Sequence, residues 1–171
     1  ARLLKKRGEA MQEAVPPGNG AMLALIGANF DTVAKIAKVA SSKGICAPAN
    51  DNGPGQIVLS GEVAAIDRAM ELASEEGVKR TVKLPVSAPF HCKLMEPASR
   101  VMADTLENTN IAHPKTSIVM NVSSKPESDP NKIKTLLVEQ VTAMVRWRES
   151  IEMMRDDGVD TMIEIGAGKV L

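Results

Sequence analysis

The sequence predicts an α/β protein built from two parts, and three observations support this prediction. Between residues 20 and 86, apolar runs and amphipathic helical patterns follow one another in the order β-α-β-β-α-β, which is the split βαβ or ferredoxin-like arrangement. In residues 1–19 and 87–171 helical patterns dominate and only two strands are expected, so these residues predict an incomplete α/β unit. The chain has 171 residues, 44% hydrophobic and 25% charged, as is ordinary for globular proteins.

The smaller unit, residues 20–86, begins with an apolar run between two glycines, Ala21–Ile26, which predicts a strand. Asp31 is expected to cap the helix that follows, whose apolar face contains Val33, Ile36, Ala37 and Ala40. Two further strands, Ile45–Asn50 and Gln56–Ser60, form a predicted hairpin because the turn-forming residues Asp51–Gly55 separate them.

A helix and a strand complete the smaller unit. Apolar residues follow one stripe of Glu62–Glu76, which predicts a helix, and Gly77 is suited to its left-handed C-terminal cap. Lys79–Pro85 then alternates polar and apolar side chains, as a half-buried strand does.

The remaining residues predict four helices and two strands. The first helix covers residues 2–14 and ends at Pro16-Pro17-Gly18. The other helices are Lys93–Asn108, a helix opened by Asp129-Pro130, and one that contains Trp147 and ends at Gly158. The expected strands are Ser117–Val122 and Thr161–Ile165, the second followed by the turn Gly166-Ala167-Gly168, and their alternation with helices suggests a parallel sheet.

Charge and composition exclude several classes of protein. Lys and Arg number 21 and Asp and Glu also number 21, so the chain lacks the basic excess of a nucleic-acid binder, and 2% aromatic residues disfavour base stacking. The longest uncharged stretch, Ala14–Phe30, contains two prolines and cannot be a membrane helix, and the N-terminal residues do not resemble a signal peptide. Two cysteines form no disulfide framework, which predicts a reducing, cytoplasmic location.

His91 is the strongest candidate for chemistry among the side chains. It follows the expected strand that ends at Pro85 and precedes a helix, and active sites concentrate at the carboxyl ends of strands in α/β folds. A structural role for a lone histidine stays open. His113, beside Pro114 in a polar connection, is expected to be a surface residue.

Other motifs are absent or incomplete. There is no G-x-S-x-G nucleophile elbow, and Gly166–Val170 lacks the first Gly and the final Ser or Thr of a phosphate-binding loop. Cys46 and Cys92 have no zinc-site spacing, and Cys92 is a poor candidate nucleophile because adjacent residues rarely face each other. Arg7 allows two interpretations, a residue of a solvated basic helix face or a guanidinium that binds a carboxylate.

Five segments together resemble the malonyl-CoA:acyl carrier protein transacylase family. They are Arg7–Pro16 (RGEAMQEAVP), Pro48–Gly61 (PANDNGPGQIVLSG), Leu84–His91 (LPVSAPFH), Val145–Ser150 (VRWRES) and Glu164–Leu171 (EIGAGKVL). The resemblance covers nearly the whole chain. It implies a ferredoxin-like subdomain, residues 20–86, inserted in an α/β-hydrolase-like subdomain to which residues 1–19 and 87–171 belong. It also implies transfer of a malonyl group through an acyl-serine intermediate in fatty-acid biosynthesis.

The resemblance also implies roles for individual residues. His91 would be the general base, Arg7 would bind the free malonyl carboxylate, and Phe90 would narrow the acyl pocket. The backbone carbonyl of Arg146 would orient the histidine, and Asn50 and Asn52 would face the cleft between subdomains or simply form a turn. Malonyl-CoA and acyl carrier protein would be the substrate and partner of a monomeric enzyme, with no bound cofactor or metal.

One departure from the family pattern concerns the nucleophile. The family's G-H-S-x-G segment is expected before Ala1 and is absent from these residues, so we expect the chain by itself to be inactive. Two alternatives therefore stay open, a non-catalytic fragment that binds coenzyme A or carrier protein and an acyltransferase region of a larger polyketide or fatty-acid synthase.

Overall fold

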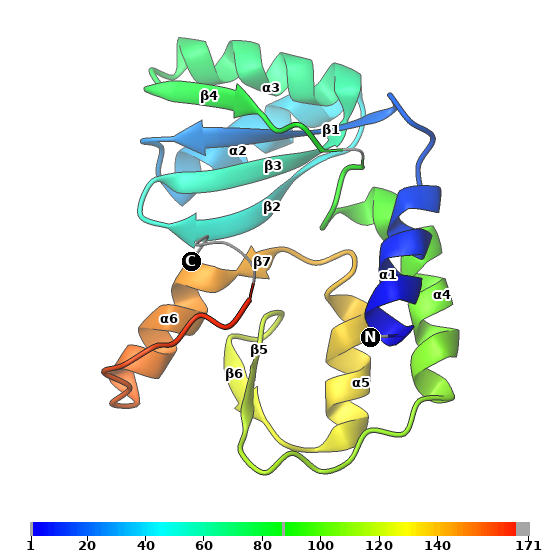
Figure 1. Ribbon diagram of the computed structural model, residues 1–171. Helices are drawn as coiled ribbons and strands as arrows, with labels where there is room; N and C mark the ends of the chain where they lie inside the picture. Colours follow the sequence, from blue (N-terminus) through cyan, green and yellow to red (C-terminus); the bar gives the residue numbers. More distant parts are fainter. Residues whose placement is uncertain (1, 87, 167–171) are drawn as a thin grey trace.

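A mixed β-sheet with two helices on one face forms one part of the molecule, and a group of helices forms the other (Figure 1). The computed structural model describes residues 2–86 and 88–166. The first part contains β1 (Gly20–Ile26), α2 (Phe30–Ala40), a 3-10 turn (Ser41–Lys43), β2 (Cys46–Gly53), β3 (Gln56–Glu62), α3 (Val63–Glu75) and β4 (Arg80–Lys83). The second contains α1 (Arg2–Glu13), a 3-10 turn (Lys93–Met95), α4 (Glu96–Glu107), β5 (Ile118–Met120), β6 (Lys125–Glu127), α5 (Pro130–Glu139), β7 (Val145–Arg146) and α6 (Trp147–Asp156).

The main sheet has the strand order β4-β1-β3-β2-β7. The β1·β3, β1·β4 and β2·β3 pairs are antiparallel, whereas β7 runs parallel to β2 at the edge. The predicted α/β class is therefore confirmed, with a mixed sheet. The elements from β1 to β4 follow the predicted order.

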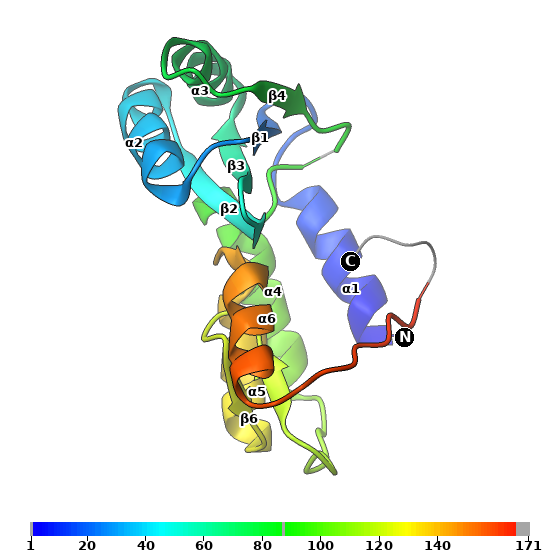
Figure 2. The ribbon, with the colours of Figure 1, turned by 90° about the vertical axis from the view of Figure 1, so that its left-hand side faces the viewer.

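Alternation of side chains along β1 explains why the sheet can be covered on both faces. Leu23 and Leu25 point into the core under α2 and α3, together with Ile36 and Ile66. Met22 and Ala24 point to the other face, where Phe90 packs against them. Figure 2 shows α2 and α3 together on one side of the sheet.

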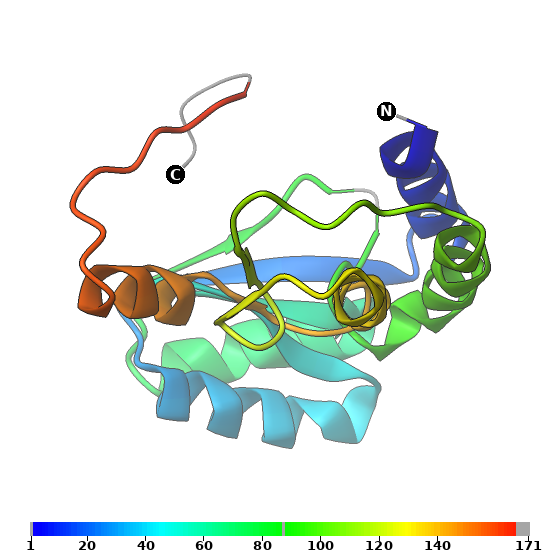
Figure 3. The same cartoon turned by 90° about the horizontal axis from the view of Figure 1, so that it is seen from below.

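The second part has its own apolar core between α1, α4 and α5. Ala10 and Met11 of α1 pack with Ala98 and Met102 of α4, and Phe90 packs against this core as well. Phe90 therefore contacts both cores, which places its neighbour His91 where the two parts meet. Figure 3 shows α6 at the opposite end of the molecule from α1 and α4.

Three expected elements differ in the structure. Thr161–Ile165 forms no strand, and Ile163 and Ile165 are 80% and 93% exposed, because among the described residues no strand pairs with this segment. The strand predicted at Ser117–Val122 is shorter and pairs antiparallel with β6 rather than entering a parallel sheet. The glycine turn predicted at residues 166–168 lies mostly outside the described residues.

The predicted cap of α2 is also wrong. Asn29, not Asp31, caps this helix, since its Oδ1 accepts a hydrogen bond from the Thr32 amide at 2.8 Å. Asp31 lies in the first turn instead, where a carboxylate is still favourable. No helix within the described residues is both long and apolar enough to cross a lipid bilayer.

Candidate active site

His91 lies in a sharp turn between β4 and α4, and its backbone is unusual. Its φ is 58°, in the left-handed region that residues other than glycine rarely adopt. The turn is held because the Cys92 thiol donates to the Pro89 carbonyl at 3.2 Å and the Met95 amide donates to the Cys92 carbonyl at 3.0 Å. Backbone strain of this kind is often found at functional sites.

The imidazole of His91 is oriented by two backbone carbonyl groups. Its Nδ1 lies 3.2 Å from the carbonyl oxygen of Gln140 and 3.2 Å from that of Ala143. A carbonyl oxygen only accepts hydrogen bonds, so Nδ1 carries the proton and Nε2 keeps a free lone pair in the neutral ring. This tautomer can take a proton at Nε2, as a general base must.

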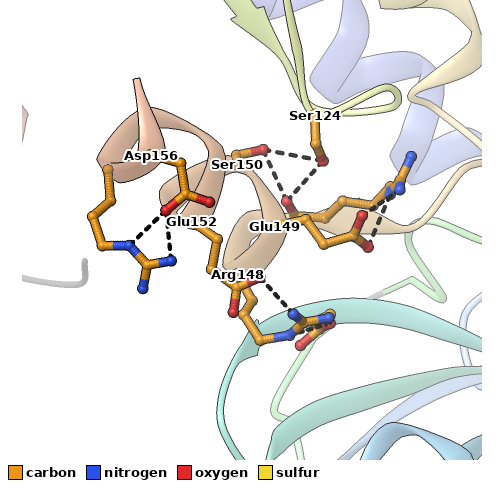
Figure 4. Close-up of polar contacts among 9 residues, drawn as sticks. Ser124, Arg148, Glu149, Ser150, Glu152 and Asp156 are labelled. Carbon is orange, nitrogen blue, oxygen red and sulfur yellow. Dashed lines mark hydrogen bonds and ion pairs between the residues drawn. The ribbon is translucent and has the colours of Figure 1, made fainter. Parts of the chain in front are cut away.

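The orienting role expected for the Arg146 carbonyl is therefore wrong. That oxygen accepts hydrogen bonds from Ser150 Oγ at 2.8 Å and from Ser124 Oγ at 3.3 Å, and so it stabilises the start of α6 (Figure 4). The Ala143 carbonyl, which does contact His91, lies only three residues before the expected Arg146 carbonyl. A backbone carbonyl leaves no side-chain signature, so sequence alone could not place this role.

Arg7 and Phe90 share a small pocket with His91. Gly8, Met11 and Gln12 complete its lining, and its volume is about 200 Å³. The helix α1 carries Arg7 to this pocket because its Ala10 and Met11 are buried against α4, which leaves Arg7 on the neighbouring face. The structure thus brings Arg7 together with Phe90 and His91, which lie far from it in the sequence.

The Arg7 guanidinium is partly buried, and no carboxylate of the described residues pairs with it. Burial lowers the pKa of Arg7 from its ordinary value, although a guanidinium remains charged in proteins. A desolvated cation without a partner favours an anionic ligand, because such a ligand would supply the missing hydrogen-bond acceptors.

The pKa of His91 is lowered from its ordinary value. Burial is the main cause, and the positive charge of Arg7 adds to it, whereas the hydrogen bonds to the Gln140 and Ala143 carbonyls act in the opposite direction. A lowered pKa keeps the imidazole neutral near pH 7, so that it can accept a proton.

Asn50 and Asn52 do not line this pocket. Strand β2 continues to Gly53, so both asparagines lie in a strand rather than in the turn, which Pro54 and Gly55 form. Asn50 lies opposite Val58 of β3 on one side and Val145 of β7 on the other.

Asp51, between these asparagines, forms an ion pair that the sequence did not predict. Its side chain is 2% exposed, and Arg148 of α6 contacts its Oδ2 through Nη2 at 2.8 Å and Nε at 2.9 Å.

His113, the second histidine of the chain, is exposed, as expected.

A larger hollow of about 630 Å³ lies elsewhere, between the end of α1 and the starts of α3 and α4. Its charged lining residues are Lys43, Glu62 and Lys93, and Glu62 already accepts a hydrogen bond from the Ile45 amide at 2.9 Å. It contains no histidine, so the smaller pocket with His91 is the better candidate for catalysis. Within residues 2–86 and 88–166, no three His, Cys, Asp or Glu side chains gather as metal ligands.

The chain is similar to known acyl transferases over its whole length. The family model described as "Acyl transferase domain" matches residues 1–171. The chain is 44% identical to the malonyl CoA-acyl carrier protein transacylase of Haemophilus influenzae over 170 residues, which cover 99% of this chain and 54% of the relative. The chain thus spans about half the length of the curated relatives it matches.

Solved structures show the same similarity. An acyl-carrier-protein-S-malonyltransferase from Bartonella henselae matches 98% of this chain and 53% of its own, with a TM-score of 0.95 and 52% identity. A malonyl-transacylase in complex with its type II PKS acyl-carrier protein matches 92% of this chain and 51% of its own, with a TM-score of 0.90 and 40% identity.

Proposed function

Because the chain belongs to the acyl transferase domain family, we propose that it is part of an enzyme that transfers a malonyl group from malonyl-CoA to the phosphopantetheine thiol of acyl carrier protein. The observation that carries this proposal is the pocket in which a neutral histidine lies beside an arginine that pairs with no carboxylate of the described residues. A base and a cation in one small pocket suit an acyl group that ends in a carboxylate.

The reaction has two steps, and His91 serves in both. In the first, His91 Nε2 takes the proton of a serine hydroxyl, the serine oxygen bonds to the thioester carbon, and the carbon–sulfur bond to coenzyme A breaks. The proton then passes from His91 to the coenzyme A sulfur. In the second, His91 takes the proton of the carrier thiol, the thiol sulfur attacks the malonyl-serine ester, and the serine oxygen leaves with that proton.

The serine would come from sequence outside these 171 residues. The lining of the His91 pocket, among the described residues, contains no serine, and Nε2 is free to meet one. The hydrogen bonds at Nδ1 hold the ring so that Nε2 presents its lone pair, which is the arrangement that general-base activation of a hydroxyl requires.

Arg7 would select the substrate. A malonyl group offers a free carboxylate, which can accept two parallel hydrogen bonds from a guanidinium, whereas an acetyl group offers none. An acetyl group in the pocket would leave the partly buried Arg7 unpaired, and such a mismatch weakens binding.

Phe90 would limit the size of the acyl group. It lines the pocket beside His91 and is packed against both cores, so its ring cannot move aside easily. We expect this ring to favour malonyl over the branched methylmalonyl group. Asn50 and Asn52 of β2 are proposed to bind the substrate outside this pocket.

The proposal includes the wider context of the enzyme. Residues 20–86 would be a ferredoxin-like subdomain inserted in an α/β-hydrolase-like subdomain to which residues 1–19 and 87–171 belong, as the β4-β1-β3-β2 strand order supports. Malonyl-CoA would be a substrate with no bound cofactor, and acyl carrier protein the partner of a monomeric, cytoplasmic enzyme. The free thiols of Cys46 and Cys92 suit a reducing compartment.

Intact-mass spectrometry tests this function directly. The intact natural protein is incubated briefly with malonyl-CoA, and in parallel with acetyl-CoA as the control that lacks a carboxylate. We expect a malonyl adduct that disappears when acyl carrier protein with its phosphopantetheine arm is added. A protein that forms no adduct and transfers no malonyl group would overturn the proposal and leave only binding without turnover.

A further inference from the structure

The two carbonyl groups that orient His91 belong to the loop between α5 and β7, residues 140–144. At its start, this loop continues α5, since the Gln140 amide donates to the Leu136 carbonyl at 3.0 Å, and Val141 is fully buried in the core with α4. At its other end, the loop runs directly into β7. The Ala143 amide donates to the Glu139 carbonyl at 3.1 Å, so α5 holds the near side of Ala143, while β7 holds the chain that follows the Ala143 carbonyl.

Strand β7 is only two residues long, so its backbone pairing with β2 is minimal. Val145 lies opposite Asn50 and Arg146 opposite Asp51. The helix α6 begins at the next residue, Trp147, and any contact that holds the first turn of α6 also holds β7.

The Asp51–Arg148 pair is such a contact. Asp51 lies on β2, with a side chain that is 2% exposed, and Arg148 reaches it from the first turn of α6 with two nitrogen atoms on one carboxylate oxygen. Figure 4 shows Arg148 extending from α6 toward the neighbouring strand, with Glu152 on its other side. A buried carboxylate is costly without a partner, so the pair strongly favours one position of α6 on β2.

We propose that Asp51 is a positioning residue for the catalytic base: through Arg148 it holds β7 and α6 on β2, and thereby holds the loop whose carbonyls orient His91. The role rests on the proposed function of His91 as a general base. Asp51 does not touch the pocket, and among the described residues the charge that acts on the imidazole is Arg7 of α1, while the α5–β7 loop faces the ring with carbonyl groups. An effect of Asp51 on His91 must therefore pass through the loop.

The test is Asp51→Asn in the intact natural protein, with Glu152→Gln as the matched control. Both changes remove one carboxylate charge that contacts Arg148, but Glu152 lies on the exposed side of α6 and connects it to nothing outside that helix. We expect D51N to lower kcat for malonyl transfer on the order of 10-fold, the size of effect that a small misplacement of a catalytic group produces, with little change in KM. E152Q should leave kcat unchanged.

The pH dependence separates positioning from general stability. Loss of the carbonyl acceptors removes the contacts that raise the pKa of His91, so D51N should shift the acidic limb of kcat/KM to lower pH. NMR titration of the His91 imidazole should show the same shift and a weaker Nδ1–H signal. This measurement needs no turnover, so it tests Asp51 even if the protein transfers no malonyl group.

A second variant completes the test. Arg148→Gln leaves the Asp51 carboxylate buried and unpaired, so it should be more harmful than D51N, and the double variant D51N/R148Q should be less harmful than R148Q. If D51N does not fold, the pH and NMR measurements on the double variant replace it. A wild-type His91 titration and wild-type kcat in folded D51N would overturn the proposal, as would an equal effect of E152Q.

Discussion

Replacement of Arg7 by alanine is the sharpest test of the proposed substrate site. The guanidinium lies in the pocket with His91, partly buried, and no carboxylate of the described residues competes for it. In the variant, the malonyl carboxylate would lose its cationic partner while the rest of the acyl group would still fit.

The expected magnitude follows from the type of interaction that the variant removes. Truncation of one partner of a desolvated, hydrogen-bonded charge pair costs about 2–5 kcal/mol. Arg7 is only partly buried, so the lower half of this range applies, and about 3 kcal/mol corresponds to a loss of roughly 100-fold in kcat/KM. Acetyl-CoA has no carboxylate, so its slow transfer should not fall, and the preference for malonyl-CoA should decrease by a similar factor.

The assay is transfer to acyl carrier protein from each thioester by the intact natural protein. Lys6→Ala is the matched control, because Lys6 neighbours Arg7 on α1 but is exposed and does not line the pocket. Arg7→Lys keeps the charge without the fork of donors and should lie between wild type and alanine. Unchanged malonyl kinetics in R7A, or an equal loss in K6A, would refute the assigned role.

Three further predictions concern the base, the pocket size and the fold. Burial and the charge of Arg7 lower the pKa of His91, and only the neutral ring can act as a base. In a pH–rate profile, kcat/KM should therefore fall with acid only below the ordinary histidine pKa of about 6.5. R7A removes the charge that lowers this pKa, so the acidic limb of its profile should lie at higher pH. Phe90→Ser should enlarge the acyl pocket and raise the ratio of methylmalonyl to malonyl transfer on the order of 10-fold, and an unchanged ratio would remove the size role. Gly61→Ala should destabilise the protein by about 2 kcal/mol or more, since the added Cβ would overlap the Ile45 backbone carbonyl; thermal unfolding at the wild-type temperature would contradict this.

Local sequence patterns determined most of the smaller unit. The apolar run of β1, the stripe of α3 and the glycine at its end depend on residues near in the chain, and Gly77 indeed adopts a positive φ of 73°. The start of α5 was equally readable, because the Asp129 side chain accepts a hydrogen bond from the Asn131 amide at 2.8 Å with Pro130 between them. Such signals act within a few residues, so they need no knowledge of the fold.

Strands that depend on distant partners were not predictable in the same way. Val145 and Arg146 are too few to show the alternation of polar and apolar residues that predicts a strand. They form β7 because they pair with the edge strand β2. Thr161–Ile165 has the apolar composition of a strand and forms none among the described residues. A strand is completed by hydrogen bonds to another segment, and the sequence of one segment does not contain its partner.

The same distinction between local and long-range information applies to the candidate active site. Histidine and arginine could be nominated from the sequence, because their side chains carry the chemistry and the surrounding motifs resemble a known family. Only the tertiary structure decided that Gln140 and Ala143 orient His91, and that Asp51 lies buried against Arg148. Backbone carbonyls have no residue type to mark them and burial is set by packing, so these features exist only once the chain has folded.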